Sequence, residues 1–189
     1  MQQDQKEYCK VIILEEIETK IINIDVEGFK KKIISLGAKP LFNGTTKSKA
    51  YKLGDSLIRL RDFGEGHVEL TYKGPALKSK YKVREEITLM VDDFERAVQI
   101  LNHIGLKGAI TFNKDRESYA LEVEGIKFHV DIDDYKVIPK FVEIETKTEE
   151  DLKFLLKYFG IDDKNTFAGS FKDLLALYNV ETSKIYKNE

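Results

Sequence analysis

Polar and hydrophobic residues alternate along much of the chain, and this pattern predicts a mainly β fold. In residues 13–22, Glu16, Glu18 and Lys20 fall on one face of an extended strand, while Ile17 and Ile21 fall on the other, because successive side chains of a strand point to opposite faces. Related patterns, bounded by turn residues, occur in residues 48–53, 56–63, 67–73, 80–90, 110–121, 126–133 and 139–146. We therefore expect eight strands that can all pair as antiparallel neighbours.

Helical periodicity separates some of these strands. Apolar residues recur with the spacing of one helix face in residues 26–36, in a segment that follows Asp92 or Asp93 and ends at Gly105, in residues 149–159, and in a short segment at 170–178. Asp25 is suited to cap the first helix and Gly160 to end the third. Turn residues predict breaks at Pro40, Asn43-Gly44, Gly54-Asp55, Gly64-Glu65-Gly66, Gly74-Pro75 and Glu124-Gly125.

The predicted strands carry charges on one face and Ile, Leu, Val, Phe and Tyr on the other. An apolar face covered by helices leaves the charged face to water or to a ligand. Closing eight strands into a barrel would remove the sheet edges and turn that face inward. We expect an α+β fold, mainly β with flanking helices, built on a closed eight-stranded antiparallel barrel or tunnel. Its charged interior would contain Lys20, Arg59, Arg61, Lys73, Lys82, Arg84, Lys114 and Arg116, together with Glu16, Glu18, Glu69, Glu86, Asp133, Glu143 and Glu145.

So many charges inside a barrel require partners, because each unpaired buried ion costs several kcal/mol. A phosphate chain would satisfy the Arg and Lys groups through charge-assisted contacts. Carboxylates could hold Mg²⁺ or Mn²⁺, which bridge phosphate oxygens. Zinc fits less well, since His67, His103, His129 and the single cysteine, Cys9, have no ligand spacing. The pattern predicts a metal-dependent triphosphate site.

Composition narrows the function classes. The chain has 189 residues and a net charge of -2, which favours one domain over residues 1–189, with a core at about 8–178 and frayed ends at 1–6 and 183–189. The absence of a basic excess argues against nucleic-acid binding. One cysteine excludes an internal disulfide, and there is no apolar membrane-length run or signal-peptide pattern. We expect a cytoplasmic protein that binds neither nucleic acid nor membranes.

Other kinds of catalytic site have little support. Gly64-Glu65-Gly66 is too short for a phosphate-binding loop, and no glycine-rich strand-to-helix motif or nucleophile elbow occurs. Catalysis by a Ser or Cys nucleophile is therefore not expected.

Six sequence blocks together resemble the CYTH superfamily of triphosphate tunnel metalloenzymes. The first, Glu16-Ile17-Glu18-Thr19-Lys20, matches the Glu-x-Glu-x-Lys signature of that superfamily. The others follow in the family's order: Ile58-Arg59-Leu60-Arg61, Leu70-Thr71-Tyr72-Lys73-Gly74-Pro75, Val83-Arg84-Glu85-Glu86-Ile87, Lys114-Asp115-Arg116 and Phe141-Val142-Glu143-Ile144-Glu145. The wording of the third and fourth blocks is most similar to the class IV adenylyl cyclase branch.

The resemblance implies an eight-stranded tunnel, often in a homodimer, that binds a nucleoside or inorganic triphosphate with two Mg²⁺ or Mn²⁺ ions. By motif position, the implied metal ligands are Glu16, Glu18, Asp133 and Glu143; the implied phosphate-binding residues are Lys20, Arg59, Arg61, Lys73, Arg84, Lys114 and Arg116; the implied catalytic residues are Glu16, Glu18, Lys20 and Lys114; and the supporting residues are Glu86 and Glu145. Asp133 is assigned because it stands ten residues before Glu143, as the family's aspartate does.

The reaction stays open at this point. The resemblance favours an adenylyl cyclase that converts ATP to cyclic AMP and pyrophosphate. One metal, on Glu16, Glu18 and Glu143, would lower the pKa of the 3′-hydroxyl, and the second would stabilise pyrophosphate with Lys73, Lys114 and Arg116. An inorganic tripolyphosphatase or thiamine triphosphatase is the alternative, and a non-catalytic polyphosphate-binding module is a further one.

Two segments depart from the family pattern and leave the wall of a nucleoside pocket undetermined. Lys49-Ala50-Tyr51-Lys52 stands where the family usually has Asp-x-Tyr-Phe, and the hairpin through Glu124-Gly125 is longer than usual.

Overall fold

The computed structural model describes residues 12–77 and 79–188, with only the backbone path described for 12–16 and 187–188. The expected fraying of residues 1–6, and the side chain of Glu16, lie outside the described residues.

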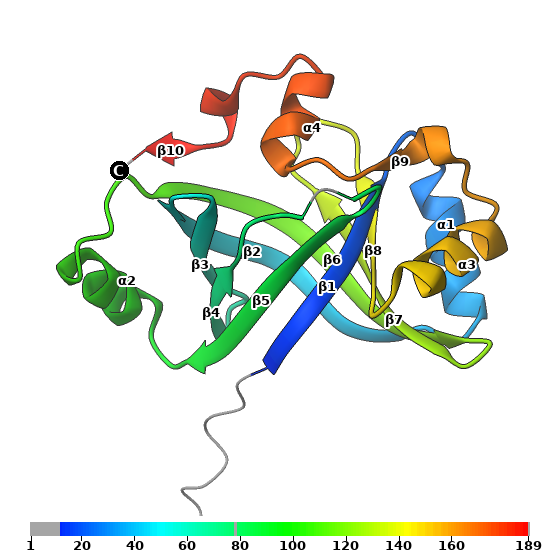
Figure 1. The fold of residues 1–189 in the computed structure, drawn as a ribbon, viewed down its shortest axis with the longest axis horizontal. Helices are drawn as coiled ribbons and strands as arrows, with labels where there is room; N and C mark the ends of the chain where they lie inside the picture. The colour runs from blue at the N-terminus through cyan, green and yellow to red at the C-terminus, as the bar shows by residue number, and fades with distance from the viewer. Residues whose placement is uncertain (1–11, 78, 189) are drawn as a thin grey trace, which may run out of the picture.

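Eight antiparallel strands form a closed ring in the order β6-β2-β3-β4-β5-β1-β8-β7, and β7 pairs back with β6. The strands are β1 (Ile12–Ile21), β2 (Lys39–Leu53), β3 (Ser56–Asp62), β4 (Val68–Lys73), β5 (Lys82–Val91), β6 (Ile110–Val123), β7 (Ile126–Asp134) and β8 (Phe141–Thr146). Two short strands add to the ring, β9 (Thr166–Phe167) beside β1 and β10 (Lys187–Asn188) beside β6. The predicted tunnel fold is confirmed (Figure 1).

The predicted turn at Pro40 and Asn43-Gly44 is wrong. These residues continue β2, which pairs with β6 from Lys39 to Ala50, and the register shifts between Pro40 and Phe42. A bulge of this kind accommodates a proline, which cannot donate to the ladder. A side chain at Gly44 would come within 3.2 Å of the Phe42 ring. Long-range pairing with β6 therefore overrides the local turn preference, and glycine leaves room for that ring.

Four α-helices cover the outside of the ring: α1 (Val26–Ser35), α2 (Phe94–His103), α3 (Glu149–Phe159) and α4 (Phe171–Leu177). Asp25 caps α1 by accepting from the Gly28 amide at 2.9 Å, and Asp93, not Asp92, caps α2. Gly160 ends α3 with a φ of 71°, a conformation that glycine adopts without strain. In Figure 1, α1 and α3 lie on one side of the ring, α2 on the opposite side and α4 above one end.

The hydrophobic core lies between the ring and its helices. The largest cluster includes Phe29, Ile33 and Leu155, which pack against outward-facing residues of β1, β6, β7 and β8. A second cluster joins α2 to β2 and β3, and a third joins α4 to Ile138 and Phe141. Because apolar burial is satisfied outside the ring, its interior is left to the charged side chains.

The chain beyond α4 passes through a 3₁₀ helix, η2 (Thr182–Lys184), and then pairs as β10 with β6. The expected fraying from residue 183 stays a prediction. Figure 1 shows it arching over the same end of the ring as α4. Among the described residues, no helix has the length and apolarity needed to cross a membrane.

Candidate functional site

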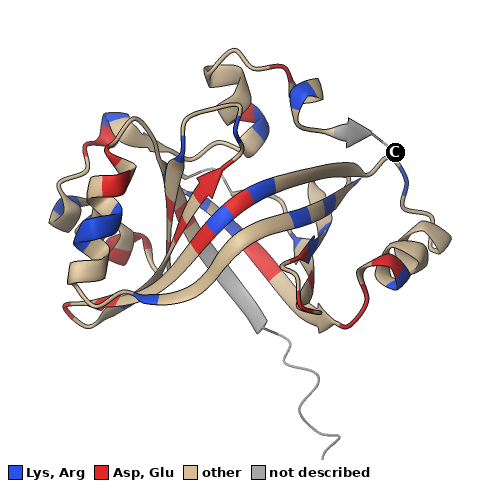
Figure 2. Ribbon diagram, turned by 180° about the vertical axis from the view of Figure 1, so that it is seen from behind, with Lys and Arg blue, Asp and Glu red and all other residues tan. Residues whose placement is uncertain are grey.

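A cavity of about 690 Å³ occupies the interior of the ring and is lined by side chains from all eight long strands. Charged residues alternate along these strands (Figure 2). All eight cations predicted to face inward line the cavity, as do Glu18, Glu69, Glu86, Glu143 and Glu145; Asp133 does not. With Lys172 and Asp131, the described lining contains nine Lys or Arg and six Asp or Glu side chains. Its cationic excess suits an anionic ligand.

Three arginines of this lining have buried donors without acceptors. The Nε atoms of Arg59, Arg61 and Arg84 have no hydrogen-bond partner, and none of the three makes an ion pair with a described residue. Burial, followed by repulsion from Arg59 and Arg116, lowers the pKa of Arg61 to about 10. Buried polar groups are normally satisfied, so unpaired guanidinium donors in a cavity indicate a missing anionic partner.

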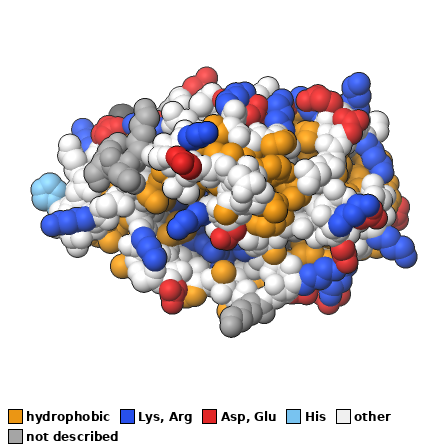
Figure 3. Space-filling model, turned by 90° about the horizontal axis from the view of Figure 1, so that it is seen from above, with side chains coloured by type: hydrophobic (Ala, Val, Ile, Leu, Met, Phe, Trp, Pro, Cys, Tyr) orange, Lys and Arg blue, Asp and Glu red, His pale blue; other side chains and the backbone are white. Residues whose placement is uncertain are grey.

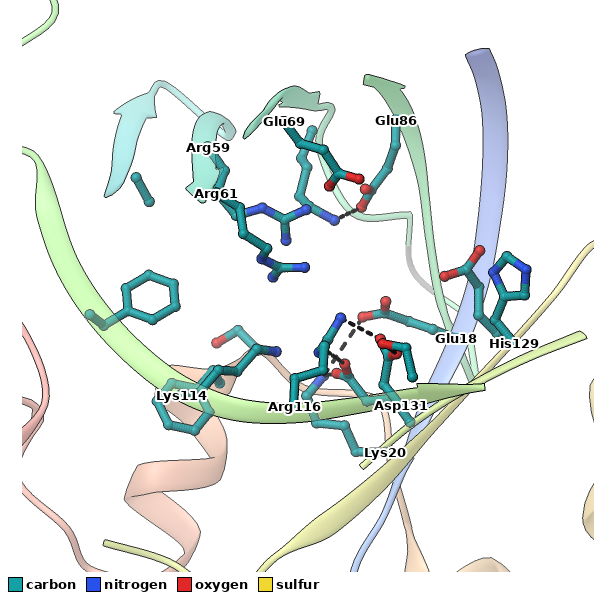
Figure 4. A pocket seen from close by; sticks show the side chains of 18 of the residues that line it. Glu18, Lys20, Arg59, Arg61, Glu69, Glu86, Lys114, Arg116, His129 and Asp131 are labelled. Atoms are coloured by element: carbon teal, nitrogen blue, oxygen red, sulfur yellow. Dashed lines mark hydrogen bonds and ion pairs between the residues drawn. The ribbon is translucent and has the colours of Figure 1, made fainter. Parts of the chain in front are cut away.

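Lys114 and Arg116 of β6 face Arg59 and Arg61 across the cavity (Figure 4). Asp133, only 1% exposed, accepts from Arg116 Nε and Nη2 at 2.7 Å each and from Lys114 Nζ at 2.5 Å. Both oxygens of this carboxylate are thus engaged behind the lining. Burial and the neighbouring Arg116 still lower the pKa of Lys114 to about 7. Asp133 therefore orients the two cations, and its carboxylate is not open to the cavity.

Lys20 and Lys82 are paired with two of the predicted metal ligands. Lys20 Nζ lies 3.0 Å from Glu143 and 3.7 Å from Glu18, and Lys82 donates to Glu18. Burial opposes the ionisation of Glu18, but Lys82 and Lys20 outweigh it and lower its pKa to about 2. The pKa of Glu143 is likewise lowered despite burial, chiefly by Lys20. Both carboxylates are therefore ionised at neutral pH.

Asp131 is a site residue that the sequence analysis missed. It lines the cavity directly opposite Glu143 in the β7–β8 ladder, accepts from Ser118 at 2.6 Å and forms an ion pair with Arg116. The available signal was its spacing: Asp131 and Asp133 share one face of β7. The alternation could not tell which of the two opens into the cavity.

The acidic residues form a group on adjacent strands. Glu18 lies opposite Glu145 in the β1–β8 ladder, and Glu143 lies opposite Asp131. Burial, followed by the charges of Glu18 and Asp131, raises the pKa of Glu145 to about 7. Such mutual repulsion is what a divalent cation relieves, and carboxylate oxygens are the ligands that Mg²⁺ and Mn²⁺ prefer. The donor set fits a divalent metal.

The same carboxylates are turned toward Lys and Arg in this structure. Within the described part of the chain, no three His, Cys, Asp or Glu residues are arranged to hold a metal ion. Glu86, predicted to be a supporting residue, is 4% exposed and pairs with Lys73. The backbone of Glu16 lies opposite Arg84 in the β1–β5 ladder.

Aromatic residues and the C-terminal segment form one end of the cavity. Phe112, Tyr135, Phe171 and Tyr186 line it together with Lys172. Seen from above, hydrophobic side chains gather on this face with Lys and Arg among them (Figure 3). The apolar spacing predicted a short helix at 170–178 but did not indicate that this helix lines the cavity.

The three histidines separate in the structure. His67 and His129 line the cavity, whereas His103 lies at the end of α2, exposed, with its Nδ1 2.7 Å from the Gln99 carbonyl oxygen.

Comparisons with known proteins agree with this geometry. A protein from Methanocaldococcus jannaschii named "putative adenylate cyclase" is 28% identical over 180 residues, covering 86% of this chain and 99% of that protein. The crystal structure of another protein with that name, from Vibrio parahaemolyticus, superposes with a TM-score of 0.71 at 18% identity, covering 86% of this chain and 98% of the other.

A third protein, from Hippeastrum, is described as a putative adenylyl cyclase with a dominant triphosphatase activity. Its structure matches with a TM-score of 0.58 at 17% identity, covering 89% of this chain and 97% of the other. The family model described as CYTH domain matches residues 45–168. This match spans most of the chain and includes most of the cavity-lining strands, so the chain belongs to the CYTH family.

Proposed function

We propose that this protein is a divalent-metal-dependent enzyme that acts on triphosphates. The observation that carries the proposal is the set of three arginines, Arg59, Arg61 and Arg84, whose buried Nε donors lack acceptors inside a closed ring. A triphosphate supplies several anionic oxygens in a row, which suits cations on opposite walls of one cavity. Lys20, Lys73, Lys82, Lys114 and Arg116 complete the proposed phosphate site.

The proposed metal ligands are Glu18, Asp131, Glu143 and Glu145, with Glu16 kept as a candidate from its motif. When bound, Mg²⁺ or Mn²⁺ would neutralise phosphate charge and activate the attacking oxygen. Glu18 and Glu143 are in the ionised form that a metal ligand requires, because nearby lysines lower their pKa values. Lys20 and Lys82, which now pair with these carboxylates, would be freed to contact phosphate oxygens. Asp133 would keep Lys114 and Arg116 aimed into the cavity.

Conversion of ATP to cyclic AMP and pyrophosphate is the reaction we place first. The names of the Methanocaldococcus and Vibrio proteins support it, and a cavity of about 690 Å³ lies within the range of about 300 to 1,000 Å³ for small-molecule sites. Hydrolysis is the second candidate, because the Hippeastrum protein is described by its triphosphatase activity. Cyclisation needs the 3′-hydroxyl in line with the α-phosphorus, whereas hydrolysis needs only a water in line with a terminal phosphorus.

The test is incubation with ATP and Mn²⁺ followed by chromatographic identification of the products. Cyclic AMP with pyrophosphate is the expected result. ADP with orthophosphate, or faster turnover of tripolyphosphate or thiamine triphosphate, would identify a hydrolase. Tight binding of ATP, tripolyphosphate and thiamine triphosphate without turnover of any of them would favour a polyphosphate-binding module.

Two variants connect the result to the site. Arg59→Ala should weaken binding of every triphosphate, and Glu18→Gln should lower turnover and its dependence on Mn²⁺. Lys153→Ala, on the exposed side of α3, is the matched control for the loss of a cation. Unchanged turnover and binding in both site variants would refute the proposed site.

A further inference from the structure

The two ends of the cavity differ in chemistry. One end lies beside the β2–β3 hairpin, where Ala50, Leu57 and Ile110 line the cavity. We call this end the α4 mouth. We call the opposite end, at the β3–β4 hairpin with Phe63 and His67, the hairpin mouth. Strand register assigns each residue to its end, since Leu57 pairs with Lys73 at one end of β3 and Arg61 pairs with Glu69 near the other.

The α4 mouth is walled by apolar and aromatic side chains from separate parts of the chain. The Tyr186 ring lies 5.8 Å from the Phe112 ring and 6.3 Å from the Phe171 ring, at interplanar angles of 65° and 72°. Phe171 is stacked on Tyr135 at 3.7 Å. All four rings line the cavity and all are only partly buried. Packed edges with exposed ring surface are suited to receive a flat apolar group.

Two lysines lie beside this wall, Lys172 and Lys114, and Lys114 also pairs with Asp133 behind the lining. Lys172 lines the same mouth and makes no ion pair with a described residue, and the Lys114 ammonium lies 5.5 Å from the Tyr135 ring centre. At the hairpin mouth, by contrast, the lining includes Glu69 beside His67. A substrate with an uncharged flat end and an anionic chain therefore matches the α4 mouth better, because its first phosphate would meet cations there.

The C-terminal residues of this wall lie beyond the segment that the CYTH domain model matches, which ends at residue 168. Two features position them: the local capping box of Ser170 and Asp173, which starts α4, and the long-range pairing of β10 with β6 at Ile110 and Thr111. The wall is therefore built in part by a segment that follows the eight strands of the ring.

We propose that Phe171, Lys172 and Tyr186, with Leu57 and Phe112, form the subsite for the organic part of the substrate, a purine nucleoside. The inference rests on the proposed function, because the ring binds the phosphate chain in both proposals. The C-terminal segment would make the site bind a nucleoside triphosphate more tightly than inorganic tripolyphosphate. The purine lies against the Tyr186 ring, and Lys172 lies beside the phosphate nearest the ribose.

The test compares calorimetric binding of ATP and of inorganic tripolyphosphate, each with and without Mg²⁺. Tyr186→Ala should weaken ATP binding about ten-fold, the loss of one base–aromatic stacking contact, while tripolyphosphate binding stays within about two-fold. Tyr186→Phe keeps the ring and should behave like the parent. Phe63→Ala removes a ring at the hairpin mouth that lies 5.7 Å from the Arg61 guanidinium, so it should change ATP and tripolyphosphate binding by the same factor.

A second readout does not depend on the alanine variant being well folded. The chain has no tryptophan, so Tyr186→Trp introduces a single one at the proposed subsite. Its emission should change on addition of ATP and not on addition of tripolyphosphate.

Several outcomes overturn the inference. Equal affinity of the parent for ATP and tripolyphosphate, an equal loss of both ligands in Tyr186→Ala, or no loss in that variant would each do so while leaving the triphosphate site intact. A larger loss of ATP than of tripolyphosphate binding in Phe63→Ala would do so too. Failure of the parent to bind either ATP or tripolyphosphate would instead refute the proposed function, and this inference with it.

Discussion

The cations inside the ring are of two physical kinds. Arg116 is locked to Asp133 through two hydrogen bonds of 2.7 Å, with a further contact to Glu143 at 3.0 Å. Arg59 and Arg61 have no such partners among the described residues, and each leaves its Nε buried without an acceptor. Removing a paired cation leaves the charge of its carboxylate partner buried without compensation, whereas removing an unpaired cation relieves repulsion from neighbouring cations. The two kinds should therefore respond oppositely to substitution.

Arg59→Ala should weaken tripolyphosphate binding at least about ten-fold, the scale of one lost charge-assisted contact. Its free energy of unfolding should stay equal to or above that of the parent. Arg116→Ala should instead lower the free energy of unfolding by about 3–5 kcal/mol, because Asp133 is left buried without its main partner. Urea denaturation and calorimetry measure the two effects, with Lys153→Ala as the control. A stability loss in Arg59→Ala as large as that in Arg116→Ala would contradict this division.

At the scale of elements, α4 matters because it is short and carries part of the cavity wall. It has seven residues, fewer than an isolated helix needs for stability in water. Ser170 and Asp173 cap it reciprocally, and Leu174 and Leu175 anchor it in the third core cluster. Phe171 and Lys172, in its first turn, depend on this cap for their position at the α4 mouth.

Ser170→Ala should cost about 1 kcal/mol, the usual cost of losing an N-cap, and should speed amide hydrogen exchange in α4. The pKa of Asp173 is lowered from 3.8 mainly by its hydrogen bonds with Ser170. A lowered folded-state pKa gives stability that is present above the ordinary value and is lost as the pH falls below it. The effect of Ser170→Ala should therefore be full at pH 7 and shrink below pH 3.8. Ser183→Ala, outside α4, is the control, and an effect independent of pH would argue against the cap.

At the scale of the whole molecule, apolar packing and charge are segregated by the ring. Three hydrophobic clusters hold the helices to its outside, while the cavity inside concentrates more positive than negative charge. Apolar packing outside the ring therefore stabilises the fold, while repulsion among the cations inside the ring destabilises it. A ligand that supplies anionic oxygens should strengthen the whole ring, since it binds only the folded state.

Tripolyphosphate should raise the thermal unfolding temperature of the parent protein. At a ligand concentration of 100 times Kd, the expected stabilisation is about 2.7 kcal/mol. Thermal scans with sodium sulfate at matched ionic strength separate specific binding from screening, and Arg59→Ala should shift less at equal ligand concentration. An identical rise with sulfate and tripolyphosphate would show that the cavity offers no site for a phosphate chain.

The sequence by itself determined most of the ring and the identity of its inner face. Strands such as β1 and β3 are found where alternation predicted them, and every predicted cation, from Lys20 to Arg116, lines the cavity. The reason is local: the two-residue period of a strand fixes which side chains share a face, whatever the strand pairs with. Helix ends at Asp25 and Gly160 were predictable for the same reason, because caps are read from neighbouring residues.

Only the tertiary structure decided the features that depend on partners distant in sequence. β2 runs through Asn43-Gly44 because β6 satisfies its backbone, and this pairing outweighs the turn preference. Asp131 opens into the cavity while Asp133 is engaged by Lys114 and Arg116, a difference that identical spacing cannot express. Tyr186 reaches the α4 mouth because β10 pairs with a strand nearly eighty residues earlier. Periodicity carries no information on such contacts, since the closure of the ring brings them together.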